Sequence, residues 1–329
     1  MKRGEYASRG PNPHEVISAK EFELPPLGEG QVLIEVLAAP INPSDVLTLT
    51  GEYGMLPPLP AVGGNEGVGR IAKLGPQADA WAIGELVLLP IGSGTWTTHM
   101  VADSQRLMAL PPQGDPLQLS MLSVNPPTAL LMLREFVDLE SGDWVIQNAA
   151  NSAVGAYLVQ IAANRGLKTV NVVRRESAVA AVKASGAEHV LVDGDDLDKR
   201  VSELTGGAKI RLGIDAVGGM ASERLARCLA PAGTMVSYGA MSGEPCMLNP
   251  GTFIFRDLRL RGFWLAQWFR TATPEKQFAV FRELAQQVAQ GELKARIQTT
   301  YGIDQISEAV AAAAAGERDG KIVLEPNKA

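Results

Sequence analysis

One stretch of the chain, residues 142–175, combines residue types and spacing that suit the binding of a nucleotide phosphate. A short apolar run, Trp144–Ile146, is typical of a buried parallel strand, and a polar turn over residues 148–152 follows it. Apolar residues then recur at helical spacing up to Arg165–Gly166, a helix stop, and a second apolar run covers residues 169–173. Strand, turn, helix and strand within about 30 residues predict a βαβ unit, the phosphate-binding half of a dinucleotide fold.

The glycine-rich fingerprint of such a unit is only partly present. Its slots read Ala150-Asn-Ser-Ala-Val-Gly155, so only the last of three glycines remains, the one that allows close packing of helix and strand. Small residues in the other two slots still allow a pyrophosphate to approach the helix N-terminus, where free N–H groups and the helix dipole favour an anion. Taken alone, the motif leaves an ordinary capped helix as an alternative.

The end of the second predicted strand indicates which dinucleotide would bind. An acidic residue that contacts the adenosine ribose is expected there, about 20 residues after the last glycine. This chain has Arg174 and Arg175 instead, with Arg174 19 residues after Gly155. A guanidinium binds a 2′-phosphate bidentately, whereas a carboxylate would repel it. The sequence therefore favours NADP(H), with Glu176 keeping NAD(H) open and a solvated arginine pair as the structural alternative.

Composition narrows the class of protein. The chain has 329 residues, 46% of them hydrophobic and 20% charged, which is typical of a soluble globular protein with two domains. Its net charge is −6 and it has no long basic run, so we expect no nucleic-acid partner. No apolar run is long enough to cross a membrane, and the N-terminus lacks the apolar core of a signal peptide. The two cysteines, Cys228 and Cys246, fit a reducing cytoplasm, where we expect the protein to act.

The pattern along the chain predicts two domains of different architecture. Short β-rich runs separated by Pro and Gly indicate a β-rich domain in residues 1–122, to which the tail, residues 268–329, returns through the run Lys321–Leu324. Residues 123–267 alternate strands and helices, which predicts a Rossmann-type doubly wound parallel sheet that binds NADP. We expect an α/β fold in which residues 1–122 with 268–329 form the catalytic domain.

This order of features resembles the medium-chain dehydrogenase/reductase superfamily, whose N-terminal domain is GroES-like. More narrowly, it is similar to the zinc-independent trans-2-enoyl thioester reductases. The segments that carry this resemblance are Ile41–Asp45, Gly51–Gly54, Leu59–Gly67, Val124–Pro126, Asn148–Gly155, Arg261–Trp268 and Gly320–Leu324. The resemblance covers nearly the whole chain and implies NADPH-dependent reduction of the C=C bond of an enoyl-CoA or enoyl-acyl-carrier-protein thioester.

Two asparagines argue against zinc. The zinc alcohol dehydrogenases of the superfamily carry a cysteine where this chain has Asn42, and a histidine where it has Asn65. Asparagine is a poor zinc ligand, so we expect no metal. For Asn42 and Asp45, which lie in an Asn-Pro-Ser-Asp turn, we favour a helix cap over a catalytic role.

The resemblance also implies roles for individual residues. Tyr53 would donate the proton to the α-carbon, since a phenol with an ordinary pKa of about 10 stays protonated at neutral pH; a packed loop tyrosine is the alternative. The implied cofactor contacts are Asn125, Asn151, Ser152, Ala153, Val154, Arg174, Arg175, Tyr238, Gly239, Ala240, Met241, Phe263, Trp264, Leu265 and Lys321. Phe263 and Trp264 read as neighbours on one strand, so we expect one of them in the core.

Other functions stay open from sequence alone. A quinone or enone reductase of the same superfamily would use the same cofactor site with a smaller acceptor, and a non-catalytic NADPH-binding relative would keep the arginines without depending on Tyr53. Such proteins usually form dimers by joining sheet edges, so we expect a homodimer in which the run Leu258–Phe263 is the edge strand.

Overall fold

The computed structural model describes residues 1–316 and 318–328, which form two compact units. One comprises Met1–Val124 and Phe281–Ala329, and the other comprises Asn125–Val280. Residues 268–280, which we expected in the β-rich domain, thus lie in the second unit. The roles assigned to the two domains stay predictions at this point.

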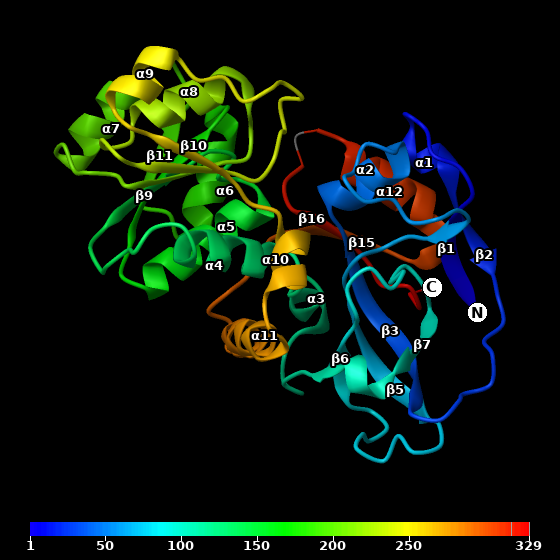
Figure 1. Cartoon of the computed structure of the whole chain (residues 1–329). Coiled ribbons are helices and arrows are strands. Elements are labelled where there is room, and N and C mark those ends of the chain that lie inside the picture. Colours follow the sequence, from blue (N-terminus) through cyan, green and yellow to red (C-terminus); the bar gives the residue numbers. More distant parts are fainter. Residues whose placement is uncertain (317, 329) are drawn as a thin grey trace. The chain divides into compact units, whose positions relative to one another are not determined.

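The second unit is a parallel six-stranded sheet with helices on both faces (Figure 1). Its strands are β9 (Trp144–Gln147), β10 (Lys168–Val173), β11 (His189–Val192), β12 (Leu212–Asp215), β13 (Thr234–Ser237) and β14 (Arg259–Gly262), in the order β11-β10-β9-β12-β13-β14. All neighbours pair in parallel. Strands β9 to β11 are added toward one edge of the sheet, and β12 to β14 are added on the other side of β9 toward the opposite edge. This strand order is that of a dinucleotide fold and confirms the predicted sheet.

Helices follow these strands in alternation. They are α4 (Asn125–Arg134), α5 (Ala153–Asn164), α6 (Val179–Ala184), α7 (Leu197–Thr205), α8 (Gly219–Arg227), α9 (Pro250–Phe255), α10 (Leu265–Thr271) and α11 (Pro274–Ala289), with a short 3₁₀ turn at Glu176–Ala178. Helix α4 begins at Asn125 and has Pro126 and Pro127 in its first turn. Proline is tolerated there, because its missing N–H would have no partner within the helix.

The first unit contains two sheets. The larger one has the order β15-β16-β3-β5-β6-β8, with β7 also paired to β3, and the smaller one has the order β2-β1-β4. The strands are β1 (Lys2–Tyr6), β2 (Ile17–Glu21), β3 (Gln31–Ile41), β4 (Ala61–Val62), β5 (Val68–Leu74), β6 (Leu86–Leu88), β7 (His99–Asp103), β8 (Met108–Ala109), β15 (Ile297–Tyr301) and β16 (Lys321–Leu324). This β-rich unit confirms the expected fold class.

The long strand β3 organises the core of this unit. Val32, Ile34 and Val36 alternate with more exposed residues and are fully buried, as expected for a strand with one face on the core. The C-terminal strand β16 pairs antiparallel with β3, so the tail returns to the first unit as predicted. Helices α1 (Pro13–Val16), α2 (Pro43–Thr50), α3 (Pro116–Leu119) and α12 (Ile306–Ala314), with 3₁₀ turns at Ser104–Arg106 and Ile303–Gln305, complete the unit. Among the described residues, no helix has the length and apolarity needed to cross a membrane.

Candidate active site

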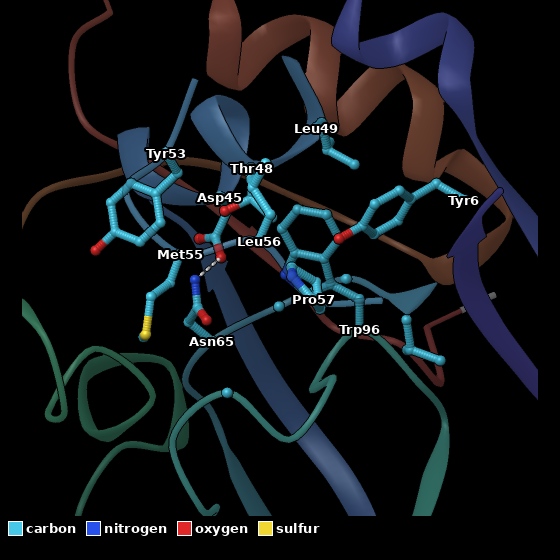
Figure 2. A pocket seen from close by; sticks show the side chains of 14 residues that line it. Tyr6, Asp45, Thr48, Leu49, Tyr53, Met55, Leu56, Pro57, Asn65 and Trp96 are labelled. Carbon is cyan, nitrogen blue, oxygen red and sulfur yellow. Dashed lines mark hydrogen bonds between the residues drawn. The ribbon is translucent and has the colours of Figure 1, made fainter. Parts of the chain in front are cut away.

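A cavity of about 280 Å³ opens in the first unit beside α2 and the loop that follows it. Tyr53, Met55 and Leu56 line it from this loop, and Tyr6 and Trp96 line it from other strands and turns. Figure 2 shows these side chains around the cavity, together with Asp45 and Asn65. The cavity therefore combines an apolar lining with a few polar groups, as small-molecule sites usually do.

Tyr53 is held by the C-terminal end of α2. Gly51 follows the helix with a φ of +88°, a left-handed conformation that glycine adopts without strain. The backbone N–H groups of Gly51, Glu52 and Tyr53 all donate to the carbonyl oxygen of Leu47, at 3.0, 2.9 and 3.2 Å. The tyrosine ring is half-buried, and its hydroxyl points away from Asp45 (Figure 2). The helix end thus fixes where this phenol stands.

The N-terminal end of α2 is capped as the sequence predicts. Asn42 is the N-cap residue, Pro43 occupies the first turn, and the Asp45 carboxylate accepts from the Asn42 N–H at 2.7 Å. The other Asp45 oxygen accepts from the Asn65 side-chain amide at 2.6 Å. The capping carboxylate therefore also orients a polar side chain that lines the cavity (Figure 2).

Behind this cap lies a buried cluster of charged and amide groups, which the sequence did not predict. Glu66 accepts from the Asn42 side-chain amide at 2.7 Å and from the backbone N–H groups of Ser123 and Val124 at 2.9 Å each. The Lys321 ammonium donates to the Asn42 side-chain oxygen and, at 3.2 Å, to the carbonyl oxygen of Ile41. We refer to Asn42, Asp45, Asn65, Glu66 and Lys321 as the buried charge cluster.

Burial shifts the pKa values of all three charged groups in this cluster. It raises the pKa of Asp45 to about 6 and that of Glu66 to about 7, and it lowers the pKa of Lys321 to about 8. Attraction between Lys321 and the two carboxylates opposes each of these shifts. All three described hydrogen-bond partners of the Glu66 carboxylate are N–H donors, and an ionised carboxylate accepts from all of them. A cofactor contact by Lys321 stays a prediction.

In the second unit, the predicted pyrophosphate loop precedes α5. Ser152 caps this helix by accepting from the Gly155 N–H at 3.0 Å, and Ala149 has a positive φ of 46°. A Cβ added at Gly155 would lie 2.6 Å from the carbonyl oxygen of Ala150, so only glycine fits there. The helix start carries Ala153 and Val154, with Asn151 exposed just before it. This loop fits a pyrophosphate, because its backbone N–H groups gather at a helix N-terminus with no bulky side chain.

Other predicted cofactor residues follow strands of the same sheet. Arg174, which is exposed, and Arg175 follow the end of β10. Tyr238 follows β13 and is hydrogen-bonded to Ser152, and burial raises its pKa above the ordinary range. The structure thus brings Tyr238 next to Ser152 of the predicted pyrophosphate loop, and the Met241 side chain is exposed. The carboxyl ends of parallel strands are where such folds bind dinucleotides.

A second set of buried polar residues holds these strand ends and was missed in the sequence. The Asn148 side chain, directly after β9, donates to Asp215 at 2.6 Å and accepts from the Ala216 N–H at 2.8 Å. Asp215, at the end of β12, also accepts from the N–H groups of Val217 and Gly218 and from the Ser222 hydroxyl. Nothing in the sequence pairs Asn148 with Asp215, since they lie 67 residues apart and meet only because β9 and β12 are neighbours.

The aromatic pair after β14 differs from expectation. The strand ends at Gly262, and Trp264 is already the N-cap residue of α10, so Phe263 and Trp264 do not alternate along a strand. Neither is in the core: Phe263 is half-buried and meets Phe136 edge-on, and Trp264 is 37% exposed. The prediction that one of them is buried was wrong, because β14 is an exposed edge strand and ends before both residues. Leu265 opens α10, and Asn125, which is buried, opens α4.

No group of three or more His, Cys, Asp or Glu residues in the described part of the chain is arranged to hold a metal ion. The positions at which zinc alcohol dehydrogenases carry ligands are Asn42 and Asn65, and both have their amide N–H groups directed at carboxylates.

Comparison with known proteins places this geometry in a family. Residues 28–112 match the alcohol dehydrogenase GroES-like domain, and residues 153–286 match the domain described as zinc-binding dehydrogenase. The mitochondrial enoyl-[acyl-carrier-protein] reductase of Rattus norvegicus is 41% identical over 297 residues, which cover 88% of this chain and 79% of the relative. The chain belongs to the enoyl-[acyl-carrier-protein] reductase family.

Solved structures agree with this assignment. A complex of Etr1p with NADP and crotonyl-CoA has a TM-score of 0.88 and 26% identity over 98% of this chain and 99% of that chain. The Etr1p/Etr2p heterodimer of mitochondrial 2-enoyl thioester reductase from Candida tropicalis has a TM-score of 0.88 and 27% identity, with the same coverage. A putative NADPH:quinone reductase from Bacillus thuringiensis has a TM-score of 0.89 and 28% identity over 98% of each chain. The resemblance to zinc-independent medium-chain reductases is therefore confirmed.

The same comparison corrects one expectation. We expected a cytoplasmic protein from the cysteine content and the N-terminal sequence. The relatives of the enoyl-[acyl-carrier-protein] reductase family that match this chain at 41% identity are named as mitochondrial, so that expectation was wrong. Cys228 and Cys246 are free thiols, and because several compartments keep thiols reduced, the cysteine content does not select one of them.

Proposed function

We propose that this protein reduces the C=C bond of trans-2-enoyl thioesters, carried on CoA or on an acyl carrier protein, with NADPH as the reductant. The observation that carries this proposal is the match to enoyl-[acyl-carrier-protein] reductases along most of the chain. The substrate chemistry does not require metal-ligating residues, and the described part of the chain has no group of them, because the thioester carbonyl itself can accept the negative charge that develops on reduction.

The second unit supports the cofactor part of this proposal. Asn151 to Val154 would hold the pyrophosphate at the N-terminus of α5, where Gly155 leaves room for close approach. Arg174 and Arg175 would bind the 2′-phosphate, because two guanidinium groups follow the strand end where an acidic residue would exclude it. When bound, NADPH supplies the hydride that reduces the β-carbon of the substrate.

Tyr53 would supply the proton that the α-carbon needs. Its position at the cavity is set by three backbone hydrogen bonds to Leu47, so the phenol is presented by the backbone of a helix end rather than by a mobile tip. A phenol is protonated at neutral pH and can donate to a carbanion-like centre without prior activation. Positioned acids of this kind contribute about 10²- to 10⁴-fold to rate.

The first test is NADPH oxidation by the purified protein with crotonyl-CoA, hexenoyl-CoA and a simple quinone side by side. We expect turnover of both thioesters, and Tyr53→Phe should lower kcat with crotonyl-CoA by about 10²-fold or more. Tyr301→Phe, at a half-buried tyrosine of β15 in the same unit, is the matched control and should keep the wild-type rate. Full activity in Tyr53→Phe would remove Tyr53 as the acid while leaving the reductase activity intact.

A quinone reductase is the second candidate, because a putative NADPH:quinone reductase superposes on this chain as well as the enoyl reductases do. It would use the same cofactor residues. Quinone turnover without thioester turnover in the same assay would make this second candidate the function. No turnover of either, with NADPH binding retained, would indicate a non-catalytic NADPH-binding relative.

We also propose that two copies of the chain associate through β14. This strand is the sheet edge and is exposed along its length, and the neighbouring helix α9 exposes Ile254 and Phe255, the latter at 88%. An exposed strand edge next to apolar side chains favours pairing with a second edge. Sedimentation velocity at micromolar concentration should give the mass of a dimer, and a monomer would contradict this assembly.

A further inference from the structure

Lys321 is a buried cation in the first unit, and its hydrogen bonds go to residues at the start of helix α2. It is 6% exposed and lies on β16, whose neighbours in the sheet are β15 and β3. Its ammonium donates to the backbone of Ile41 and to the Asn42 side chain, at the point where β3 ends and α2 begins. A lysine placed this way costs free energy of desolvation, so it requires a specific compensation.

The chemistry of its partners fixes the orientation of one amide. An ammonium only donates hydrogen bonds and a carboxylate only accepts them. Asn42 lies between the two, accepting from Lys321 with its oxygen and donating to Glu66 with its nitrogen at 2.7 Å. If the amide were flipped, its nitrogen would face the ammonium and its oxygen would face the carboxylate. The two charges therefore hold Asn42 in a single orientation.

That orientation is transmitted to the cavity through a short helix. Asn42 is the N-cap of α2, and its own N–H is held by Asp45, which also holds Asn65 at the cavity wall. The helix has eight residues, and the last backbone carbonyl it uses for capping, that of Leu47, receives the N–H of Tyr53. One end of α2 is thus fixed by the charge cluster, and the other end presents the tyrosine.

We propose that Lys321 is a positioning residue of the active site, which orients Asn42 and through α2 and Asp45 holds Tyr53 and Asn65 at the cavity. This inference rests on the proposed function for the role of Tyr53. It assigns to Lys321 a task within the first unit alone, in which the ammonium acts through Asn42 rather than by touching the reacting atoms.

The charged groups around Lys321 give this role a pH dependence. Asp45 on α2, Glu66 after β4 and Arg318 before β16 act on Lys321, and Tyr6 on β1 is influenced by Asp45. Protonation of Glu66 removes the negative charge that its three N–H partners and Lys321 face, so it weakens each of these interactions. Removing the ammonium raises the pKa of Glu66 further, because Lys321 is the largest influence that lowers it.

The test is Lys321→Met in the whole chain, which keeps an unbranched side chain one atom shorter than lysine and removes the charge. We expect kcat with crotonyl-CoA to fall about 10- to 100-fold, as for a misplaced catalytic group, with the KM for NADPH unchanged. The acidic limb of the kcat–pH profile should move to higher pH. The melting temperature should fall by about 10 °C, because two buried carboxylates lose their counter-charge. Lys328→Met, at an exposed lysine of the same tail, is the matched control.

The double variant Lys321→Met/Glu66→Gln separates positioning from simple charge balance. The added Glu66→Gln removes a carboxylate that Lys321→Met leaves without its counter-charge. We therefore expect the melting temperature to recover relative to Lys321→Met, while kcat stays low. Recovery of both, an unchanged kcat in Lys321→Met, or a raised KM for NADPH with unchanged kcat would each overturn the positioning role. A wild-type protein without thioester activity would instead refute the proposed function, and the melting and double-variant data would still report on the cluster.

Discussion

The two compact units bury carboxylates beside their predicted sites in different ways. In the second unit, uncharged groups donate the four described hydrogen bonds to the Asp215 side chain. The donors are an amide, a hydroxyl and two backbone N–H groups, at 2.6 to 3.3 Å. In the first unit, Asp45 and Glu66 lie close enough to influence each other, and the charge of the Lys321 ammonium acts on both. One centre uses neutral donors and the other uses a cation.

This difference determines which segments of the chain each group of buried polar residues connects. A single carboxylate with four donors can be satisfied locally by the loops around it, as buried polar groups usually are. Two neighbouring carboxylates repel each other, and the charge that compensates them here comes from β16, near the end of the chain. The first unit therefore couples its C-terminal strand to its cavity, whereas the second unit holds its strand ends with residues of its own loops.

The largest expected effect is on NADPH binding, at the predicted cofactor site of the second unit. Arg174→Glu replaces an exposed cation after β10 by a charge that repels a 2′-phosphate, and we expect the KM for NADPH to rise about 100-fold. The KM for NADH should change far less, because NADH lacks that phosphate. Steady-state kinetics with both cofactors measures this, and Lys209→Glu, at an exposed lysine before β12, is the control. Equal losses for both cofactors would exclude recognition of the phosphate by Arg174.

The two units also differ in how much of each could be predicted from the sequence. The βαβ unit and the place of Arg174 follow from local periodicity and spacing, and the structure has the strands, the helix and the strand end where the pattern predicts them. The boundary of the second unit and the aromatic pair after β14 were less predictable. Strand β14 ends at Gly262, before the aromatic pair, and α10 and the start of α11 belong to the second unit, which therefore continues past residue 267.

The buried charge cluster could not be predicted for a physical reason. A strand Lys-Ile-Val-Leu suggests a lysine at an exposed end, but β16 lies between β15 and β3, so all four of its side chains are buried. Contacts such as Lys321 to Asn42, 279 residues apart, depend on which strands become neighbours. Local periodicity carries no information on that pairing.

The pH dependence of stability is the next test of the comparison. Burial raises the pKa of Glu66 from 4.5 to about 7, so between these values the folded state binds a proton that the unfolded chain has released. The free energy of unfolding therefore falls as the pH rises through this window, and Asp45 adds to the fall between 3.8 and about 6. We expect Glu66→Gln to remove about 3 kcal/mol of this decline.

Chemical denaturation at several pH values between 4 and 8 measures this slope. Glu203→Gln, at an exposed glutamate of α7 in the other unit, should leave the wild-type curve in place. A Glu66→Gln curve parallel to that of the wild type would show that this carboxyl group titrates alike in the folded and unfolded chains. The burial of charge would then have no consequence for stability in this pH range.

The smallest expected effect is on the free energy of unfolding and concerns Asp215, whose described donors are all uncharged. Ser222→Ala removes one of the four donors of Asp215, a hydroxyl at 2.6 Å, and leaves the other three. We expect a loss of about 1 to 2 kcal/mol in the free energy of unfolding, the usual cost of a charge-assisted hydrogen bond in a buried site. Urea denaturation measures it, with Ser202→Ala at an exposed position of α7 expected to stay within about 0.5 kcal/mol of the wild type. If Ser222→Ala is as stable as its control, three donors suffice for a buried carboxylate. Lys321 would then be required by the pairing of two carboxylates and not by the burial of either one.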